Sequence, residues 1–403
     1  ESGIGRILFY GDKMKVGYFC NSTNWNNKKK YNQILKEIRE IADYCDTNSW
    51  DSIWFTEHHF SHEGMEICPN PIMLSADIAA RTKQIRIGQA ATIITFWNPI
   101  RIAEDIALLD NLSNGRVEAG IGRGIYGREA LNMNINADTK DNKKNFRLFE
   151  ETISILKKAW TEEFFDHDGE FYKYPTPNFE WSHDMSPPND KFMDLKTNIM
   201  KKISIVPKPL QKPHPPLWQV VDSNNSIEWA AKNGINTIMW IPTVQTLKKR
   251  FQVYKNARSE AEQRNVELGD GVCLVRDMFI ANSMEEAREK AGEQMVNYIK
   301  WVCHWRGLGN HMNPNEELPY TENKLDLLNY DFLHKRNMLF GTVDYVISKI
   351  EELKKELNLQ YLQVWSNFPD VKHENCMKSI KLFTEKVIPH FKSQDNSKIK
   401  QAS

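Results

Sequence analysis

Two groups of residues in this chain carry side chains that can do chemistry. The first is Glu57-His58-His59, a carboxylate and two imidazoles that directly follow the apolar segment 52–56. A histidine titrates near working pH, so an imidazole beside a substrate can act as a general acid or base. We therefore take Glu57, His58 and His59 as candidate catalytic residues. The alternative is that the histidine pair is a hydrogen-bonded structural feature.

The second group has the chemistry of an anion site. Arg123 lies in a Gly-Arg-Gly turn after an apolar segment, and residues 222–226 open a helical segment with serines and asparagines. A helix start offers free N–H groups, and an arginine can bind a phosphate with two hydrogen bonds. The candidate cofactor-binding residues here are Arg123, Asp222, Ser223, Asn224 and Ser226. The alternatives are an ordinary helix cap, and an ion pair of Arg123 with Glu57 or Glu118.

A third feature is the pair Ala90-Ala91, whose small side chains offer a flat wall to a planar ring. Together with the anion site, this wall fits a phosphorylated aromatic cofactor better than a simple sugar or acid. Tight packing is the other explanation for two adjacent alanines. His58, His62 and Cys68 lie close in the sequence, but their spacing is not that of a zinc site, so we expect no metal.

Alternating strands and helices must position these residues. Helical segments, with apolar residues at three- and four-residue spacing, separate segments that have the composition of buried parallel strands. This order predicts a (β/α)8 barrel, in which function lies at the carboxyl ends of the strands. The eight strand segments are residues 15–19, 52–56, 85–94, 117–122, 217–221, 237–241, 272–280 and 361–365.

The clearest repeat unit spans residues 85–126. Asn98-Pro99 is a typical helix start, with Asn as the cap and Pro at the first helical position, and Gly115 is a typical stop. An open doubly wound sheet is the alternative architecture. It requires a Gly-x-Gly-x-x-Gly turn after the first strand, where this chain has Phe19-Cys20-Asn21-Ser22.

The composition excludes some classes of partner. The chain has 403 residues, with 53 Lys and Arg against 53 Asp and Glu, so its net charge is zero. A neutral chain is unsuited to bulk electrostatic binding of nucleic acid or of an anionic membrane. The six cysteines form no Cys-x-x-Cys pair, and no apolar run has transmembrane length. We therefore expect reduced thiols in a cytoplasmic protein.

We expect a single barrel domain over residues 14–391. Residues 1–13 precede what resembles a natural Met start, so they are either an added or an extra N-terminal segment. The long, polar, proline-bearing stretch 175–202 predicts an inserted surface loop. The irregular stretch 307–333 predicts a lid, and residues 392–403 form a polar tail.

An ordered set of motifs resembles the luciferase-like, flavin-dependent monooxygenases, the family of the bacterial luciferase α subunit. The resemblance covers Met14 to about Phe391, and the set is far more specific than any one motif. The motifs are Glu57-His58-His59-Phe60, Gly88-Gln-Ala-Ala-Thr92, Asn98-Pro99-Ile-Arg101, Gly122-Arg-Gly-Ile-Tyr126, Pro213-His-Pro-Pro216, Glu228-Trp-Ala-Ala231 and Phe340-Gly341-Thr342.

This resemblance implies a two-component monooxygenase. Such an enzyme binds reduced FMN at the barrel rim and reacts it with O₂ to give a C4a-peroxyflavin, which oxygenates a small organic substrate. A separate NAD(P)H:flavin reductase supplies the reduced FMN. The expected assembly is a homodimer.

The resemblance also implies residue roles. Ala90–Ala91 would be a non-prolyl cis peptide beside the flavin ring, and His58 would be the catalytic base. The insertion 175–202 is longer than in the luciferase pattern and could reshape the substrate mouth. The residues expected at the flavin phosphate are Arg123, Ser223, Asn224 and Ser226. Tyr126, Glu129 and Trp240 complete the candidate cofactor-binding residues at the same rim.

Two alternative functions remain open at this point. One is an oxidoreductase of the same superfamily that transfers a hydride with the deazaflavin F420 and without oxygen. The other is a non-catalytic flavin-binding subunit. The residues Glu57-His58-His59 and the long segment 307–333 favour an active enzyme. The luciferase α subunit has a reactive cysteine where this chain has Gly122, so light emission does not follow from the resemblance.

Overall fold

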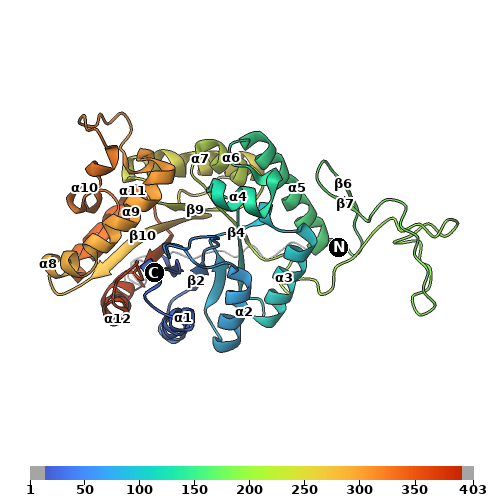
Figure 1. Ribbon diagram of the computed structural model, residues 1–403, viewed down its shortest axis with the longest axis horizontal. Coiled ribbons are helices and arrows are strands. Elements are labelled where there is room, and N and C mark those ends of the chain that lie inside the picture. The colour runs from blue at the N-terminus through green and yellow to red at the C-terminus, as the bar shows by residue number, and fades with distance from the viewer. Residues whose placement is uncertain (1–13, 393–403) are drawn as a thin grey trace, which may run out of the picture.

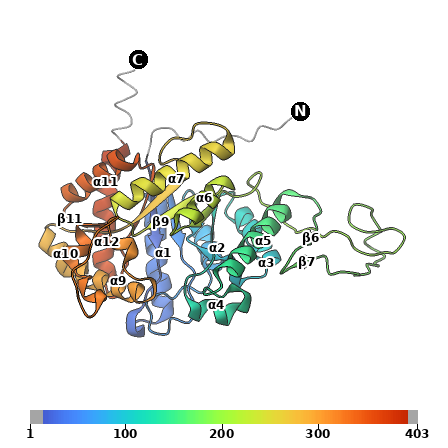
Figure 2. The ribbon, with the colours of Figure 1, turned by 90° about the horizontal axis from the view of Figure 1, so that it is seen from above.

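The computed structural model describes residues 14–392, and a closed barrel of parallel strands forms its centre (Figures 1 and 2). Each barrel strand pairs with the next one in the order given below, and the last strand pairs with the first. The predicted (β/α)8 barrel is therefore confirmed. Its strands are β1 (Lys15–Cys20), β2 (Ser52–Phe55), β3 (Arg86–Gln89), β5 (Val117–Gly122), β8 (Leu217–Val220), β9 (Asn236–Trp240), β10 (Val272–Ile280) and β12 (Tyr361–Trp365). The segments expected at residues 1–13 and 393–403 lie outside the described residues.

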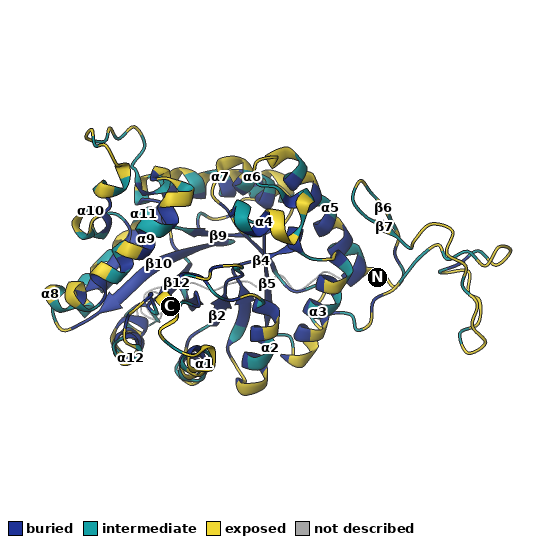
Figure 3. Cartoon of the chain, viewed as in Figure 1, coloured by how far each residue is buried: buried dark blue, intermediate teal, exposed yellow. Residues whose placement is uncertain are grey.

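The helices form the outer layer, with buried residues on their inner sides and exposed residues on their outer sides (Figure 3). They are α1 (Tyr31–Thr47), α2 (Pro71–Arg81), α3 (Pro99–Leu112), α4 (Gly127–Met133), α5 (Asn142–Thr161), α6 (Asn224–Lys232), α7 (Val244–Glu262), α8 (Met284–Ala287), α9 (Glu293–Arg306), α10 (Tyr330–His334), α11 (Val343–Leu357) and α12 (His373–Leu382). Short 3₁₀ turns occur at η1 (Trp25–Asn27), η2 (Ile94–Phe96), η3 (Ile135–Ala137), η5 (Gly309–His311) and η6 (Lys324–Leu327). The π-helical segments are η4 (Arg288–Gly292) and η7 (Phe383–Val387).

The start of α3 has the predicted geometry. Asn98 Oδ1 accepts hydrogen bonds from the backbone N–H of Ile100 and Arg101, at 2.9 and 3.3 Å, and Pro99 is the first helical residue. The chain turns after this helix at Gly115, which has a φ of 78°. This local chemistry fixes the βαβ unit that presents Arg123 beyond the end of β5.

Two strand assignments differ from the prediction. The segment 85–94 was predicted as one strand, but β3 ends at Gln89 and a short strand, β4 (Thr92–Ile93), follows and pairs with β5. The strand β11 (Met338–Gly341) was not predicted, and it pairs with the Asp277–Ile280 end of β10. A four-residue apolar run carries too little periodicity to be distinguished from a loop.

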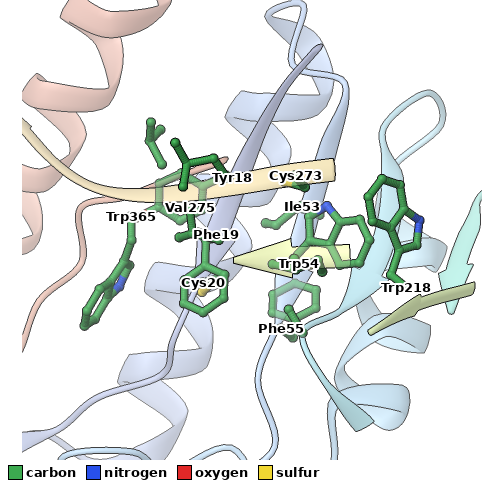
Figure 4. Packing of buried hydrophobic residues seen from close by; sticks show 14 of the residues in the cluster. Tyr18, Phe19, Cys20, Ile53, Trp54, Phe55, Trp218, Cys273, Val275 and Trp365 are labelled. Carbon is green, nitrogen blue, oxygen red and sulfur yellow. The ribbon is translucent and has the colours of Figure 1, made fainter. Parts of the chain in front are cut away.

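Aromatic side chains fill the barrel interior (Figure 4). The Trp54 and Trp218 rings meet edge to face with centroids 5.6 Å apart, and Tyr361 packs against both. Trp54 Nε1 donates to Ser52 Oγ at 2.8 Å. A Cβ atom at Gly88 would lie 2.2 Å from the Trp54 ring, so only glycine leaves room for the indole. Because this level of the barrel is packed solid, a ligand can bind only nearer the rim.

The insertion 175–202 follows a short hairpin, β6 (His167–Asp168) with β7 (Lys173–Tyr174), and projects away from the barrel (Figures 1 and 2). Bridges such as Glu180 with Ile199 hold its two arms together. In the described structure, none of its residues lines the rim cavity that is presented below. The insertion therefore forms no part of this cavity in the described structure, and an effect on the substrate mouth stays a prediction.

Several general features follow from the described residues. All six cysteines are buried and unpaired. Between residues 14 and 392, no helix is both long and apolar enough to cross a bilayer. The same part of the chain contains no cluster of three or more His, Cys, Asp or Glu side chains that is placed to hold a metal ion.

Candidate functional site

The carboxyl ends of β2, β3, β5, β8 and β9 surround a cavity of about 430 Å³. A larger hollow of about 540 Å³ lies between α1 and the start of α12, but it contains none of the expected site residues. In the described structure, His59 and Asn224 do not line the rim cavity. The expected residues that do line it are Glu57, His58, Ala90, Ala91, Arg123, Tyr126, Glu129, Asp222, Ser223, Ser226 and Trp240.

His58 lies between two carboxylates. Its Nδ1 is 3.2 Å from Glu129 Oε1 and 3.3 Å from Glu66 Oε2. Burial by itself would lower the pKa of His58, but the negative charges of Glu66 and Glu129 outweigh burial and raise the pKa to about 9. The sequence predicted titration near neutral pH. The structure instead makes His58 an imidazolium at neutral pH, which can donate a proton.

Glu66 and Tyr298 belong to this network, and the sequence did not reveal either of them. Tyr298 on α9 donates from its hydroxyl to Glu66 Oε1 at 2.6 Å. Asn21, beyond the end of β1, donates from Nδ2 to the Tyr298 hydroxyl at 2.9 Å. Glu66 sits in a polar loop and Tyr298 on an aromatic-rich helix, so no local pattern marks either one.

Glu57 and His59 contact each other, although Glu57 also lines the cavity. The Glu57 carboxylate accepts hydrogen bonds from His59 Nε2 at 2.9 Å, Trp97 Nε1 at 2.8 Å and the Ile93 backbone N–H at 2.8 Å. Burial raises the pKa of Glu57, and these donors oppose the rise. The pair thus fastens the segment after β3 to the end of β2, which is a positioning role. That either residue takes part in catalysis stays a prediction.

Ala90 and Ala91 form part of the wall of the cavity that His58 also lines. The peptide bond between them is cis, as the resemblance implies. Gly122 lies directly behind this wall, because a Cβ atom there would be 3.1 Å from Ala91 Cβ and 3.0 Å from Ile93 Cδ1. The absence of a side chain at Gly122 lets the wall and the end of β5 approach closely.

Arg123 and the start of α6 form the cationic end of the cavity. Arg123 Nη1 donates to Asn142 Oδ1 at 2.9 Å, and its guanidinium lies 5.4 Å from the centre of the Phe146 ring. Glu57 is bound as described above and Glu118 pairs with Arg86, so the alternative ion pair of Arg123 is wrong. Among residues 14–392, no carboxylate forms an ion pair with Arg123, and burial lowers the pKa of the guanidinium.

Ser223 caps α6, because its Oγ accepts a hydrogen bond from the Ser226 backbone N–H at 3.2 Å. The same hydroxyl donates to Ser226 Oγ at 3.0 Å. Both hydroxyls line the cavity beside the positive end of the helix. These two hydroxyls at the helix start, together with the Arg123 guanidinium that pairs with no carboxylate of the described residues, fit a phosphate group.

Asp222 does not offer its carboxylate to the cavity as a free group. It forms an ion pair with the buried Arg306, the last residue of α9, and accepts a hydrogen bond from Asn310 Nδ2 at 3.4 Å. Arg250 Nη2 donates to the Asp222 carbonyl at 2.7 Å. Asp222 thus holds the start of segment 307–333 against the rim. Arg306 also lines the cavity and was missed in the sequence, because its partner lies 84 residues away.

Aromatic rings close the remaining side of the cavity. Tyr126 packs against Trp301 and Trp305 of α9, with ring centroids 5.7 and 6.0 Å apart. Trp240 Nε1 donates to Asp277 Oδ1 at 3.0 Å, and burial raises the pKa of Asp277 to about 7. Tyr126 and Trp240 thus give this side of the cavity an aromatic lining, with Trp301 and Trp305 packed against Tyr126.

Residues 14–358 match the family model for luciferase-like monooxygenases. The chain belongs to this luciferase-like monooxygenase family. The fit of this cavity to a flavin-type cofactor can be tested on the structure, and Gln219 provides such a test. Its side chain is buried at the cavity, and its Oε1 accepts no hydrogen bond from any described residue. A buried amide oxygen without a donor is costly, so a polar ring edge in the cavity would satisfy it.

The chain is similar in sequence to a flavin-dependent monooxygenase, and similar in fold to solved structures that bind FMN or F420. It is 28% identical over 286 residues to the oxygenase component of flavin-dependent trigonelline monooxygenase from Acinetobacter baylyi, covering 71% of this chain and 70% of the relative. The FMN complex of the oxygenating constituent of 3,6-diketocamphane monooxygenase from Pseudomonas putida has a TM-score of 0.73 and 21% identity, covering 94% and 98% of the two chains.

A third likeness is to a protein of different chemistry. An F420-dependent secondary alcohol dehydrogenase, in complex with an F420-acetone adduct, has a TM-score of 0.64 and 15% identity, covering 93% of this chain and 98% of the dehydrogenase. At such identities the solved structures show the shared barrel fold. The fold by itself therefore does not decide between the chemistries in these names.

Proposed function

We propose that this protein is the oxygenase component of a two-component monooxygenase that uses reduced FMN and O₂ to oxygenate a small organic substrate. The observation that carries the proposal is the division of one cavity into a cationic end at Arg123 and a protonated imidazole at His58, with the Ala90–Ala91 wall between β2 and β5. The name of the Acinetobacter relative supports the same activity.

The residues present fit FMN. Arg123, Ser223 and Ser226 would hold its phosphate, and Ala90–Ala91 would lie against its ring system. Gln219 would contact a polar ring edge. Bound reduced FMN supplies the electrons with which molecular oxygen is reduced.

The protein's own contribution is to manage a proton and exclude water. His58 holds a proton that can pass from Nε2 into the cavity, since both carboxylates contact Nδ1. Tyr126, Trp240 and Trp301 shield this space from solvent. A dry, positively charged donor stabilises negative charge that develops on oxygen during the reaction.

The proposed partner is a separate NAD(P)H:flavin reductase, because reduced FMN must be supplied continuously. The phrase "oxygenase component" in the name of the Acinetobacter relative supports this division of labour. The expected homodimer and cytoplasmic location stay predictions.

An F420-dependent hydride transfer is the second candidate function. The likeness to the F420-dependent secondary alcohol dehydrogenase favours it. Hydride transfer to or from an alcohol also moves a proton, so the carboxylate-flanked His58 fits both reactions, and the name of the Acinetobacter relative weighs toward oxygenation. The same cluster weighs against a non-catalytic subunit, because a buried, carboxylate-flanked histidine has no obvious use there.

The test compares the two cofactors directly. Reduced FMN and reduced F420 are titrated into the protein without oxygen, and the FMN complex is then mixed with isotopically labelled O₂ and candidate substrates. Trigonelline, the compound in the name of the Acinetobacter relative, is the first to try. We expect tight binding of reduced FMN and label in one product. Tight binding of reduced F420 alone, with no label incorporated, would show that the proposal is wrong.

A further inference from the structure

We propose that Glu66 is a positioning residue that keeps His58 in its cationic form, with Nε2–H directed into the cavity. Glu66 does not itself touch the cofactor or substrate in this proposal, and it acts through the imidazole. The proposal rests on the proposed function only for the identity of the group that receives the proton.

The first argument is the state of the Glu66 carboxylate. Its Oε1 accepts the hydroxyl of Tyr298, while its Oε2 receives no hydrogen bond from any residue between 14 and 392. The closest charge partner of Oε2 is His58 Nδ1, at 3.3 Å. A buried carboxylate oxygen without a donor is stable only when a positive charge compensates it. Glu66 and a charged His58 therefore require each other.

The second argument is the direction of the imidazole. Glu66 and Glu129 both approach Nδ1, and none of the described residues hydrogen-bonds to Nε2. The His58 ring lines the cavity with 13% of its side chain exposed. The carboxylates therefore fix one ring nitrogen and leave the other available to a bound molecule.

Glu66 and Glu129 are not equivalent. Glu129 Oε1 also accepts the backbone N–H of His59 at 2.8 Å, so part of its role is to hold the chain after β2. Glu66 Oε1 accepts the neutral Tyr298 hydroxyl, and burial raises the pKa of that hydroxyl far above neutral. The other groups coupled to Glu66 are the neutral Tyr126 and the Arg306 cation, which is itself paired with Asp222, so His58 is the cation in contact with Glu66.

Other groups around His58 do not replace this charge. Glu57, on the same segment, is bound by three donors, and Tyr126, whose ring centroid lies 5.6 Å from that of His58, stays neutral because burial raises its pKa. Arg306 on α9 is paired with Asp222. Removing the Glu66 charge should therefore shift the proton equilibrium of His58.

The experiment measures that equilibrium in the flavin-free protein. Histidine labelled with ¹³C at Cε1 is titrated by NMR, and the His58 signal is assigned by its loss in His58→Gln. We expect a wild-type midpoint near 9. In Glu66→Gln, which keeps the shape of the side chain, the midpoint should fall by about 1–3 units. Glu63→Gln is the matched control, since Glu63 lies in the same loop but pairs with Arg128. In this variant the His58 midpoint should equal that of the wild type.

A second readout uses the loaded enzyme. If Glu66 acts through His58, the fall of product formation at high pH should move to lower pH in Glu66→Gln, and the rate should recover as the pH is lowered. A merely structural defect would lower the rate at every pH.

Two results would overturn the proposal. One is a wild-type His58 midpoint near the ordinary value of about 6.5, which needs no variant at all. The other is a folded Glu66→Gln protein whose His58 midpoint equals that of the wild type. Because the titration contains no flavin, an unchanged midpoint in Glu66→Gln leaves the proposed function standing, and failure of flavin binding leaves the titration intact. A wild-type midpoint near the ordinary value of about 6.5 would also remove the protonated imidazole from the support of the proposed function, which reduced-FMN binding and label incorporation would then decide by themselves.

Discussion

The two ends of the cavity differ in how their charges are compensated. At the His58 end, the imidazolium, Glu66, Glu129 and Tyr298 form contacts with one another across the end of β2, α4 and α9. At the Arg123 end, the guanidinium has a neutral amide partner, and the start of α6 is capped by its own serine. At the first end the charged groups contact one another, whereas at the second the cation has no carboxylate partner among the described residues.

This difference indicates that the His58 end is suited to proton donation and the Arg123 end to anion binding. A group whose partners are all protein groups has its charge and direction set in advance, which is the arrangement needed to donate a proton. A cation without a carboxylate partner is suited to an anion that arrives from solution. Changes at the His58 end should therefore affect chemistry, and changes at the Arg123 end should affect binding.

The largest effect is expected for His58→Gln. A general acid typically contributes about 10²–10⁴-fold to a rate, so formation of oxygenated product should fall by that factor. Oxidation of the flavin should continue and release hydrogen peroxide, while the affinity for reduced FMN stays within a few-fold. Product and peroxide are quantified together. His62→Gln, an exposed histidine in the same loop, is the control and should resemble the wild type. Equal product yields from His58→Gln and wild type would refute the role of the imidazole.

Arg123→Ala tests the opposite end. Loss of a charge-assisted contact to phosphate should cost about 1.5–3 kcal/mol of reduced-FMN affinity, or roughly ten- to a hundredfold. The affinity is measured without oxygen by fluorescence or calorimetry. Arg101→Ala removes an exposed guanidinium from α3, where it contacts Glu104 and Asp105, and should leave the affinity unchanged. If both variants bind reduced FMN like the wild type, the cationic end is not the phosphate site.

A smaller effect is expected on stability as a function of pH. The folded-state pKa of His58 is raised to about 9, so the stabilisation by its charge is complete below the unfolded value of about 6.5 and is lost as the pH rises toward 9. Allowing for partial solvent screening, we expect a loss of about 2 kcal/mol across this window. Urea unfolding at several pH values measures it. His58→Gln lacks the titrating group, so the difference between the two proteins should shrink with rising pH, and a constant difference would contradict this account.

The smallest effect is expected at segment 307–333. Asn310 and Arg306 hold the start of this segment to Asp222 at the cationic end, while the remainder follows two glycines, Gly307 and Gly309. Limited proteolysis should cut first within this segment, and reduced FMN should slow the cut several-fold. First cleavage in the projecting insertion 175–202, with 307–333 resistant, would argue against a lid.

Much of the fold was predictable because its determinants are local. Asn98-Pro99 starts α3 through the Asn side chain and the fixed φ of proline, and Ser223 caps α6 through its own hydroxyl. The alternation of apolar strand segments with helical segments predicted the barrel, and a barrel brings the carboxyl ends of its strands together. The position of Arg123 and of Ser226 at one rim follows from those facts alone.

The sequence by itself determined most of the elements that form and many of the residues that reach the rim. The tertiary structure alone decided that His59 turns to Glu57, that Asp222 is taken by Arg306, and that Glu66 and Tyr298 join His58. These partners are far apart in the chain: 232 residues separate Glu66 from Tyr298. The protonation state of His58 depends on charges a few ångströms away, and no periodicity or spacing in a sequence encodes a distance between such distant residues.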